Sequence, residues 1–307
     1  MRVIVSGGSG LLGGALVDRL AALGHDLIIL TRDASGQPEK GGPRVRTVEW
    51  TPDGQTGPWA REMDGADAVV NLAGAGIADR RWTSARKALI RSSRVLATRS
   101  LVSAVREAPR RPSVFIQGSA VGYYGADRGD TPLDESFPPG DDFLGQVCVA
   151  WEGEAYPAQA LGCRLVIART GIILASSGGV LARMKPPFQF FVGGPVASGD
   201  QFISWIHVDD WVAMMVWALT SASVDGAFNA TAPEPATNRV FSAALGRALR
   251  RPSWLPVPGP ALRVLFGELA GPLLIRGQRV LPARALAGGF TFSHPRIDDA
   301  MTTSLGR

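Results

Sequence analysis

Short apolar runs alternate with longer amphipathic segments over the first 174 residues. The short runs have the length and composition of buried strands, and they cover residues 3–5, 27–30, 44–50, 66–72, 113–117 and 164–168. Apolar residues three or four apart predict helices at residues 15–23, 83–107 and 143–161. Because strands that alternate with such helices are joined by right-handed crossovers, the pattern predicts an α/β fold with one parallel sheet covered on both faces.

The alternation of short apolar runs and amphipathic segments stops after residue 174. From about residue 232 the pattern changes again, to helical and proline-rich stretches. Gly and Pro punctuate residues 176–199, so we expect a substrate-side loop insertion at about 175–205. We expect a strand at 202–207 and a helix that begins at 209. An edge strand is expected at 228–231 and a further helix at 238–249. Polar stretches rich in Gly or Pro predict loops at 34–43, 51–64 and 127–142. The expected organisation is a doubly wound domain at 1–231 and a smaller, mostly helical cap at 232–307.

Three glycines separate the first strand from the first helix in a G-x-x-G-x-x-G spacing. Gly7 allows a sharp turn, Gly10 lets backbone N–H groups approach a diphosphate, and Gly13 allows close packing of the helix on the sheet. A glycine turn without a ligand is the alternative, but the flanking strand and helix favour dinucleotide binding. We assign to this site Gly7, Ser9, Gly10, Leu11, Leu12 and Gly13.

The end of the second strand predicts which dinucleotide binds. An acidic residue there favours NAD, whereas an arginine suits the additional 2′-phosphate of NADP. This chain has Thr31 and Arg32 at that place, with Asp33 one step further on. The alternative is that Arg32 is only a solvated loop residue. We assign Thr31 and Arg32 to cofactor binding and predict NADP(H).

Small residues follow two further strands of the predicted sheet. Ligands of such sheets bind beyond the carboxyl ends of the strands, where small residues let a dinucleotide lie over the backbone. The fourth strand ends in Asn71, and the sixth runs into a second polar and glycine-containing exit. The residues assigned to the cofactor at these exits are Leu72, Ala73, Gly74, Arg169, Thr170 and Gly171.

Composition narrows the class of protein. Hydrophobic residues make up 46% and charged residues 19% of the 307, which is ordinary for a globular protein with a sizeable core. No apolar run reaches membrane-spanning length, and the chain starts with a strand instead of a cleavable leader, so a cytoplasmic protein without membrane contacts is expected. Two cysteines, Cys148 and Cys163, and three dispersed histidines predict neither a disulfide framework nor a metal site.

Charge and helix length bear on the partners. The net charge is +5, but the basic residues form small dispersed groups, so no nucleic-acid partner is expected. The expected partner is a small-molecule substrate. The chain is expected to be a monomer or a homodimer, since the long helix at 83–107 could pair across a two-fold axis.

Several motifs together resemble the extended short-chain dehydrogenase/reductase superfamily. More narrowly, the chain is similar to the epimerase-like family of atypical members that carries a C-terminal domain of unknown function. Besides the glycine turn and the two strand exits, the resemblance rests on residues 81–83, 118–125, 139–144, 205–210 and 277–282. It covers nearly the whole chain, and it implies a Rossmann-type fold that binds NADP(H).

The resemblance also identifies candidate catalytic residues. The superfamily moves a proton with a Tyr-x-x-x-Lys pair and positions the substrate oxygen with a serine or threonine. Ser119 matches the serine, but Leu144 and Cys148 occupy the places of the tyrosine and lysine. Tyr123, four residues after Ser119, is the candidate replacement for the tyrosine, as is its neighbour Tyr124, and packing against the cofactor loop is the alternative role of both.

Two other groups are weaker candidates for catalysis. Cys148 as a nucleophile competes with the more ordinary role of a small buried residue. His207 with Asp209 or Asp210 could be an acid/base pair, although this stretch is usually structural in the family.

Two functions follow from these expectations. The first is an NADP(H)-binding, epimerase-like oxidoreductase that acts on a small carbonyl, hydroxyl or sugar-derived compound enclosed by the cap. Sugar-nucleotide epimerisation is the weaker version, because Leu144 replaces the proton-transferring tyrosine. The alternative is a non-catalytic NADP(H) sensor or interaction protein, which the missing Tyr-x-x-x-Lys pair favours.

Overall fold

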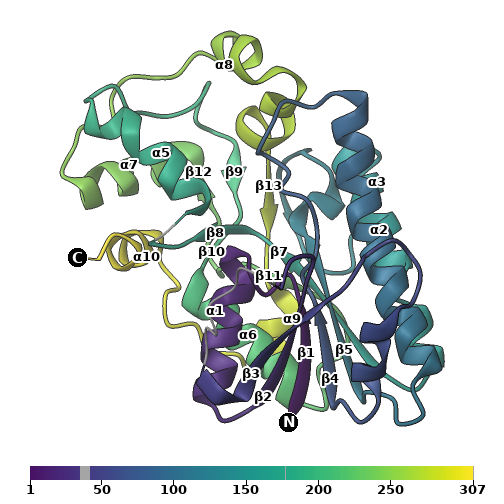
Figure 1. The fold of residues 1–307 in the computed structure, drawn as a ribbon. Helices are drawn as coiled ribbons and strands as arrows, with labels where there is room; N and C mark the ends of the chain where they lie inside the picture. Colours follow the sequence, from purple (N-terminus) through teal and green to yellow (C-terminus); the bar gives the residue numbers. More distant parts are fainter. Residues whose placement is uncertain (35–41, 177, 307) are drawn as a thin grey trace.

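The computed structural model describes residues 1–34, 42–176 and 178–306, so most of the expected loop at 34–43 lies outside the described residues. Its centre is a parallel sheet in the strand order β11-β7-β5-β4-β1-β2-β3, with helices on both faces (Figure 1). The strands are β1 (Arg2–Ser6), β2 (Asp26–Thr31), β3 (Val45–Glu49), β4 (Ala68–Asn71), β5 (Val114–Ala120), β7 (Arg164–Thr170) and β11 (Gly226–Ala230). This order confirms the expected doubly wound fold, including the edge strand at 226–230.

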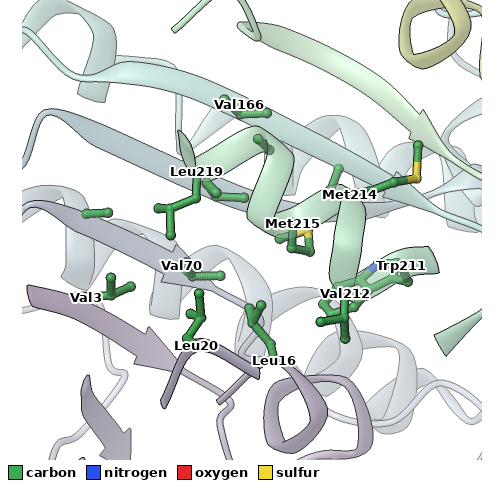
Figure 2. Close-up of a cluster of buried hydrophobic side chains, with 14 of the residues drawn as sticks. Val3, Leu16, Leu20, Val70, Val166, Trp211, Val212, Met214, Met215 and Leu219 are labelled. Carbon is green, nitrogen blue, oxygen red and sulfur yellow. The ribbon is translucent and has the colours of Figure 1, made fainter. Parts of the chain in front are cut away.

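Each face of the sheet has its own layer of helices. One face is covered by α1 (Leu11–Ala22) and α6 (Val208–Thr220), and the other by α2 (Ser84–Glu107), α3 (Phe143–Gly153) and α4 (Pro157–Ala160). Figure 2 shows Leu16 and Leu20 of α1 and Met215 and Leu219 of α6 in one buried cluster with Val70 of β4. This packing brings the exits of the parallel strands to one edge of the sheet, where ligands bind in such folds.

Two expected elements are interrupted. The helix expected at 143–161 ends at Gly153, and α4 begins at Pro157, because proline has no N–H to continue the helix. The strand expected at 202–207 is divided into β9 (Phe202–Ile203) and β10 (Trp205–His207). Neither joins the central sheet, since β9 pairs with β12 (Ala236–Thr237) and β10 with β8 (Ile172–Leu174).

Three expected loops contain regular structure. Residues 127–142 include β6 (Asp127–Leu133), which pairs in parallel with β13 (Gly277–Val280), and residues 51–64 include a 3-10 helix, η2 (Pro58–Met63). Residues 176–199 include α5 (Gly179–Gln189), despite Pro186 and Pro187 within it. The low helix propensity of the prolines is outweighed because Leu181 and Phe188 of α5 are buried in the core of the cap.

The cap is built from two separate parts of the chain. Its core unites Leu181 and Phe188 with residues of α7 (Asn238–Leu249) and α10 (Ile297–Ser304), such as Phe241 and Met301. The chain between α7 and α10 forms α8 (Gly259–Phe266), the short helices η4 (Gly267–Leu269) and η5 (Gly271–Ile275), and α9 (Ala283–Ala287). The division of the chain at residue 231 stays a prediction.

The remaining short helices are η1 (Gly42–Arg44) and η3 (Val121–Tyr124). In the part of the chain that the structure describes, no helix combines the length and apolar character needed to cross a membrane.

Candidate functional site

The glycine turn has the geometry expected of a diphosphate cradle. Gly7 has φ +74°, and a Cβ there would lie 2.8 Å from the carbonyl carbon and oxygen of Leu72. A Cβ at Gly13 would lie 2.1 Å from the Gly7 carbonyl oxygen, so both positions require glycine. At Gly10 a Cβ would meet only that same oxygen, at 3.3 Å, among the described residues. The space outside Gly10 is therefore open to a ligand.

The N-terminus of α1 presents free backbone donors at this turn. Gly10 is its N-cap and offers no side chain to bond the first N–H groups of the helix. Ser9 and Leu11 are exposed at its start, whereas Leu12 is half-buried against the sheet core. Such an uncapped helix N-terminus attracts anions through its N–H groups and its dipole. The backbone of residues 9–13 thus fits the diphosphate of a dinucleotide.

Arg32 lies in the exposed turn directly after β2. Thr31 is held by its neighbour, because its Oγ1 accepts the N–H of Asp33 at 3.4 Å and donates to the Asp33 carbonyl oxygen at 3.1 Å. The Arg32 guanidinium has no carboxylate partner within the described ranges. It is therefore an available cation at the place where the adenine ribose of a dinucleotide lies in folds of this type.

A buried amide network shapes the exit of β4. Asn71 Oδ1 accepts the Ser6 hydroxyl at 2.7 Å and the Ala73 N–H at 3.3 Å. Asn71 Nδ2 donates to Thr98 Oγ1 at 2.9 Å and to Gln117 Oε1 at 3.0 Å, which ties the exit to α2 and β5. The network holds Leu72 and Ala73 against the Gly7 turn.

Arg94 is a buried cation at this exit that the sequence analysis missed. It lies on α2, is 8% exposed, and its Nη1 donates to the carbonyl oxygens of Ala75 and Ile90 at 2.9 and 3.0 Å. Its Cζ would lie 3.0 Å from a Cβ at Gly74 and is 5.0 Å from the ring centroid of Trp151. Burial lowers the pKa of Arg94. No carboxylate within the described ranges neutralises the charge.

Two features indicate that this place binds a hydrogen-bond acceptor of a ligand. Arg94 uses only Nη1 for hydrogen bonds to the described residues, so Nε and Nη2 are left without protein partners there. The indole Nε1 of Trp151 is buried and also lacks a partner within the described residues. A buried donor without a partner, such as the Trp151 N–H, is rare in proteins, and a bound oxygen acceptor would satisfy it. The sequence signal was a cation on the apolar stripe of α2 that includes Ile90, Ala97 and Leu101.

The exits of β5 and β7 are joined by a buried ion pair. Glu152 of α3 receives the Nε and Nη2 groups of Arg169 at 3.0 and 2.9 Å, and their side chains are 2% and 4% exposed. The Ser119 hydroxyl donates to Glu152 Oε1 at 2.6 Å. Burial opposes the charge on Arg169, but the hydrogen bonds and the charge of Glu152 raise its pKa. The guanidinium of Arg169 is therefore directed into the protein.

The other two assigned residues of the β7 exit are also packed tightly. Thr170 Oγ1 accepts the indole N–H of Trp211 at 3.1 Å. A Cβ at Gly171 would lie 2.6 Å from the carbonyl oxygen of Ser204, so glycine is required there. Any cofactor contact of this exit would come from the backbone or the methyl group of Thr170.

The two adjacent tyrosines have different surroundings. Tyr124 is fully buried, donates to Asn229 Oδ1 at 2.7 Å and accepts from Arg169 Nη1 at 3.1 Å. Burial raises the pKa of Tyr124 to about 12, so it remains a phenol. Tyr123 is half-buried, and its ring centroid lies 3.4 Å from the Arg169 Cζ. Its hydroxyl has no hydrogen-bond partner among the described residues, which leaves it available to a ligand.

The positions of the missing Tyr-x-x-x-Lys pair are buried and apolar in character. Leu144 packs with Trp82 and with Leu269, which comes from the cap. Burial raises the pKa of Cys148 to about 12, so its thiol is not an activated nucleophile. Neither side chain transfers a proton at neutral pH.

The cap is held over this region by side chains from the first turn of α2 and from the segment before it. Arg81 Nε and Nη2 donate to the carbonyl oxygens of Leu265 and Val264 at 2.9 and 2.6 Å. Lys87 forms an ion pair with Glu268 at 3.0 Å. The N-terminal ends of α2 and α3 are thus covered by the turn after α8.

His207 has a structural role at the start of α6. Its Nδ1 accepts the Asp209 N–H at 3.2 Å, and its ring lies 4.0 Å from that of His294. Asp210 accepts the N–H groups of Ser293 and His294 at 2.7 and 2.9 Å. The structure thus brings His294 from the C-terminal region beside His207 and Asp209. Because Nδ1 and Asp210 already have backbone partners, the group caps α6 and holds the C-terminal segment.

Comparisons with known proteins agree with this architecture. Residues 3–230 match the NAD dependent epimerase/dehydratase family, and residues 257–303 match a domain of unknown function, DUF1731. Epimerase family protein Mb2239 of Mycobacterium bovis is 40% identical over 300 residues, which are 97% of this chain and 96% of that protein.

Two crystal structures are similar over the whole chain. That of the human epimerase family protein SDR39U1 with NADPH is 34% identical, covers 100% of both chains and has a TM-score of 0.88. That of a nucleoside-diphosphate sugar epimerase from Corynebacterium glutamicum is 33% identical with a TM-score of 0.78, and it matches 100% of this chain but 58% of its own length. The glycine turn, the sheet order and the match over residues 3–230 show that this chain belongs to the NAD dependent epimerase/dehydratase family, with DUF1731 at its C-terminal end.

Proposed function

We propose that the chain binds NADP(H) across the carboxyl edge of its sheet. The observation that carries the proposal is an uncapped helix N-terminus at the open Gly10, combined with an available guanidinium, Arg32, at the end of β2. The human relative at a TM-score of 0.88 was crystallised with NADPH, which supports the same choice. The backbone of residues 9–13 would hold the diphosphate, and Arg32 with Thr31 would hold the 2′-phosphate.

Residues at the other strand exits would complete the cofactor site. Leu72, Ala73 and Gly74 would lie beneath the dinucleotide, with the backbone at Thr170 and Gly171 along its nicotinamide end. Arg94 and the indole N–H of Trp151 would donate to acceptor oxygens of the bound molecule. A ligand acceptor would satisfy the buried Trp151 N–H, which has no partner among the described residues, and would use the Arg94 nitrogens that Ala75 and Ile90 leave unused.

The proposed reaction is oxidation or reduction of a small carbonyl, hydroxyl or sugar-derived compound. When bound, the nicotinamide supplies hydride chemistry. Tyr123 would exchange the proton with the substrate oxygen, because its hydroxyl has no partner among the described residues. Ser119 donates to Glu152, so its lone pairs would accept a hydrogen bond from a substrate hydroxyl and orient that group. Arg169, whose Cζ lies 3.4 Å from the Tyr123 ring centroid, would hold that ring in place.

A specific observation supports a second function, that of a non-catalytic NADP(H) sensor. Burial raises the pKa values of Tyr124 and Cys148 to about 12, and Leu144 has no proton to transfer. This leaves Tyr123 as the available acid or base beside Ser119 in the described part of the site. If Tyr123 transfers no proton, the chain would still bind the cofactor. Contacts between the cap and α2, such as the Lys87–Glu268 ion pair, would then change when the cofactor binds.

Nucleotide titration tests the cofactor proposal. The wild-type chain should bind NADPH more tightly than NADH, and Arg32→Glu should weaken NADPH binding at least about tenfold, because a charge-assisted hydrogen bond is worth about 1.5–3 kcal/mol. NADH binding should change little. Arg91→Glu, the same charge change at an exposed position of α2, is the matched control. Equal affinity for both nucleotides in the wild type would contradict the proposal.

Turnover separates the two functions. Wild-type protein and Tyr123→Phe are incubated with NADPH and a panel of carbonyl compounds while the loss of nicotinamide absorbance is followed. Turnover that Tyr123→Phe abolishes, with NADPH affinity unchanged, is expected for the oxidoreductase. Tight NADPH binding without turnover of any compound favours the sensor.

A further inference from the structure

The outer rim of the cap exposes an unusual number of large apolar side chains. Phe190 is 77% exposed and Trp254 is 67% exposed, and Phe191, Val192 and Leu255 are also exposed. We call these five residues the rim patch. They lie on two segments, one following α5 and one preceding α8, at the end of the molecule opposite β1 to β3 (Figure 1).

The two segments form one continuous surface. The Leu255 N–H donates to the Gly193 carbonyl oxygen at 3.3 Å, and the Ala197 N–H donates to the Val257 carbonyl oxygen at 2.9 Å. The Arg251 Cζ lies 4.8 Å from the ring centroid of Phe191. Single exposed apolar residues are ordinary on proteins, whereas a contiguous group of aromatic rings indicates an interaction surface.

The backbone holds the rings in solvent. Phe191 has φ +62°, a conformation that bulky residues rarely adopt. Its N–H donates to the Phe188 carbonyl oxygen at 3.0 Å, and the Val192 N–H donates to the Pro187 carbonyl oxygen at 2.9 Å. Phe188 itself is buried in the cap core, which anchors the turn. The exposure of Phe190 and Phe191 is therefore a built feature of the fold.

Basic residues predominate around the rim patch, although Asp298 pairs with Arg247 and Asp200 with Arg239. Residues 185–199 and 247–266 contain five Lys and Arg residues and no Asp or Glu. Arg250, Arg251 and Arg263 are exposed, and none of them forms an ion pair with another described residue. Helix α8 continues the apolar character, since Val264 is 75% exposed. A surface of exposed aromatic rings with unpaired arginines beside it is complementary to an anionic, amphiphilic partner.

We propose that the rim patch docks on the surface of an anionic lipid bilayer. Trp254, Phe190 and Phe191 enter the headgroup region, where aromatic rings are favoured, and Arg250 and Arg251 lie against lipid phosphates. We expected no membrane contact from the sequence, on the basis of spanning segments and leaders alone. Surface docking needs neither of them, since it depends on a folded patch.

Vesicle co-sedimentation with the full-length protein tests the proposal. The wild type should sediment with vesicles of phosphatidylcholine mixed with phosphatidylglycerol, and far less with phosphatidylcholine alone. The double variant Arg250→Gln/Arg251→Gln should bind weaker by about fivefold for each arginine, and added salt should weaken the wild type similarly. Trp254→Ser/Phe190→Ser should abolish sedimentation. Leu23→Gln, an equally drastic change at a residue 44% exposed on the opposite end of the molecule, is the control.

A folding control and three outcomes complete the test. Circular dichroism and thermal melts establish that each variant is folded, which is expected because the substituted side chains are exposed. Absence of wild-type binding to anionic vesicles, or binding that Trp254→Ser/Phe190→Ser leaves unchanged, would overturn it. A dimer in analytical ultracentrifugation that Trp254→Ser dissociates, without vesicle binding, would assign the patch to a second copy of the chain instead.

Discussion

Replacing Glu152 by glutamine tests whether its ion pair with Arg169 holds the strand exits together. The two side chains are 2% and 4% exposed, so the substitution leaves a buried guanidinium without a counter-charge. Breaking a buried pair in this way costs about 3–5 kcal/mol. Glutamine keeps an oxygen that can accept the Ser119 hydroxyl, so we expect the lower end, about 3 kcal/mol.

The assay is urea unfolding followed by tryptophan fluorescence, with a thermal melt beside it. For a chain of this size about 3 kcal/mol corresponds to a fall in Tm of about 5 °C. The double variant Glu152→Gln/Arg169→Met removes both charges and should be more stable than Glu152→Gln alone, since no unpaired ion remains.

A matched control separates this effect from a general sensitivity of α3. Glu154 pairs with Arg99 at 2.6 Å on the same part of the chain, but their side chains are 26% and 50% exposed. Glu154→Gln should therefore cost less than about 1 kcal/mol. Equal losses for the two glutamine variants, or additive losses in the double variant, would refute the reasoning from burial.

Three further predictions concern single residues. Gly13→Ala should lower both stability and NADPH affinity, because its Cβ would lie 2.1 Å from the Gly7 carbonyl oxygen; calorimetry and nucleotide titration measure the two effects. Tyr124→Phe should cost about 1–2 kcal/mol in urea unfolding, whereas Tyr123→Phe should cost little, because only the Tyr124 hydroxyl has buried partners. Burial, and then the nearby charge of His294, lower the pKa of His207 from 6.5, so the unfolded chain binds the proton first and stability should fall as the pH drops below that value. His207→Asn keeps an acceptor for α6 and should flatten this pH dependence of Tm; an unchanged slope would contradict it.

The local features of this protein could be predicted from the sequence because each depends on neighbouring residues. The spacing of Gly7, Gly10 and Gly13 between an apolar strand and an amphipathic helix determines a turn that has one stable geometry. The strand succession up to residue 174 follows from hydrophobic periodicity, and the family followed from short motifs along the chain. The role proposed for Arg32 stays a prediction, and it rests on a local property, its place directly after β2.

Only the tertiary structure decided which distant side chains meet. Ser119, Glu152 and Arg169 come from β5, α3 and β7, and nothing in their spacing indicates that a buried ion pair would occupy the hydroxyl. Pairing of β6 with β13 likewise turned an expected loop into a strand, because its hydrogen-bond partner lies in the C-terminal region. Such contacts form when the sheet and cap close around them, and their energies depend on burial that a linear pattern does not contain.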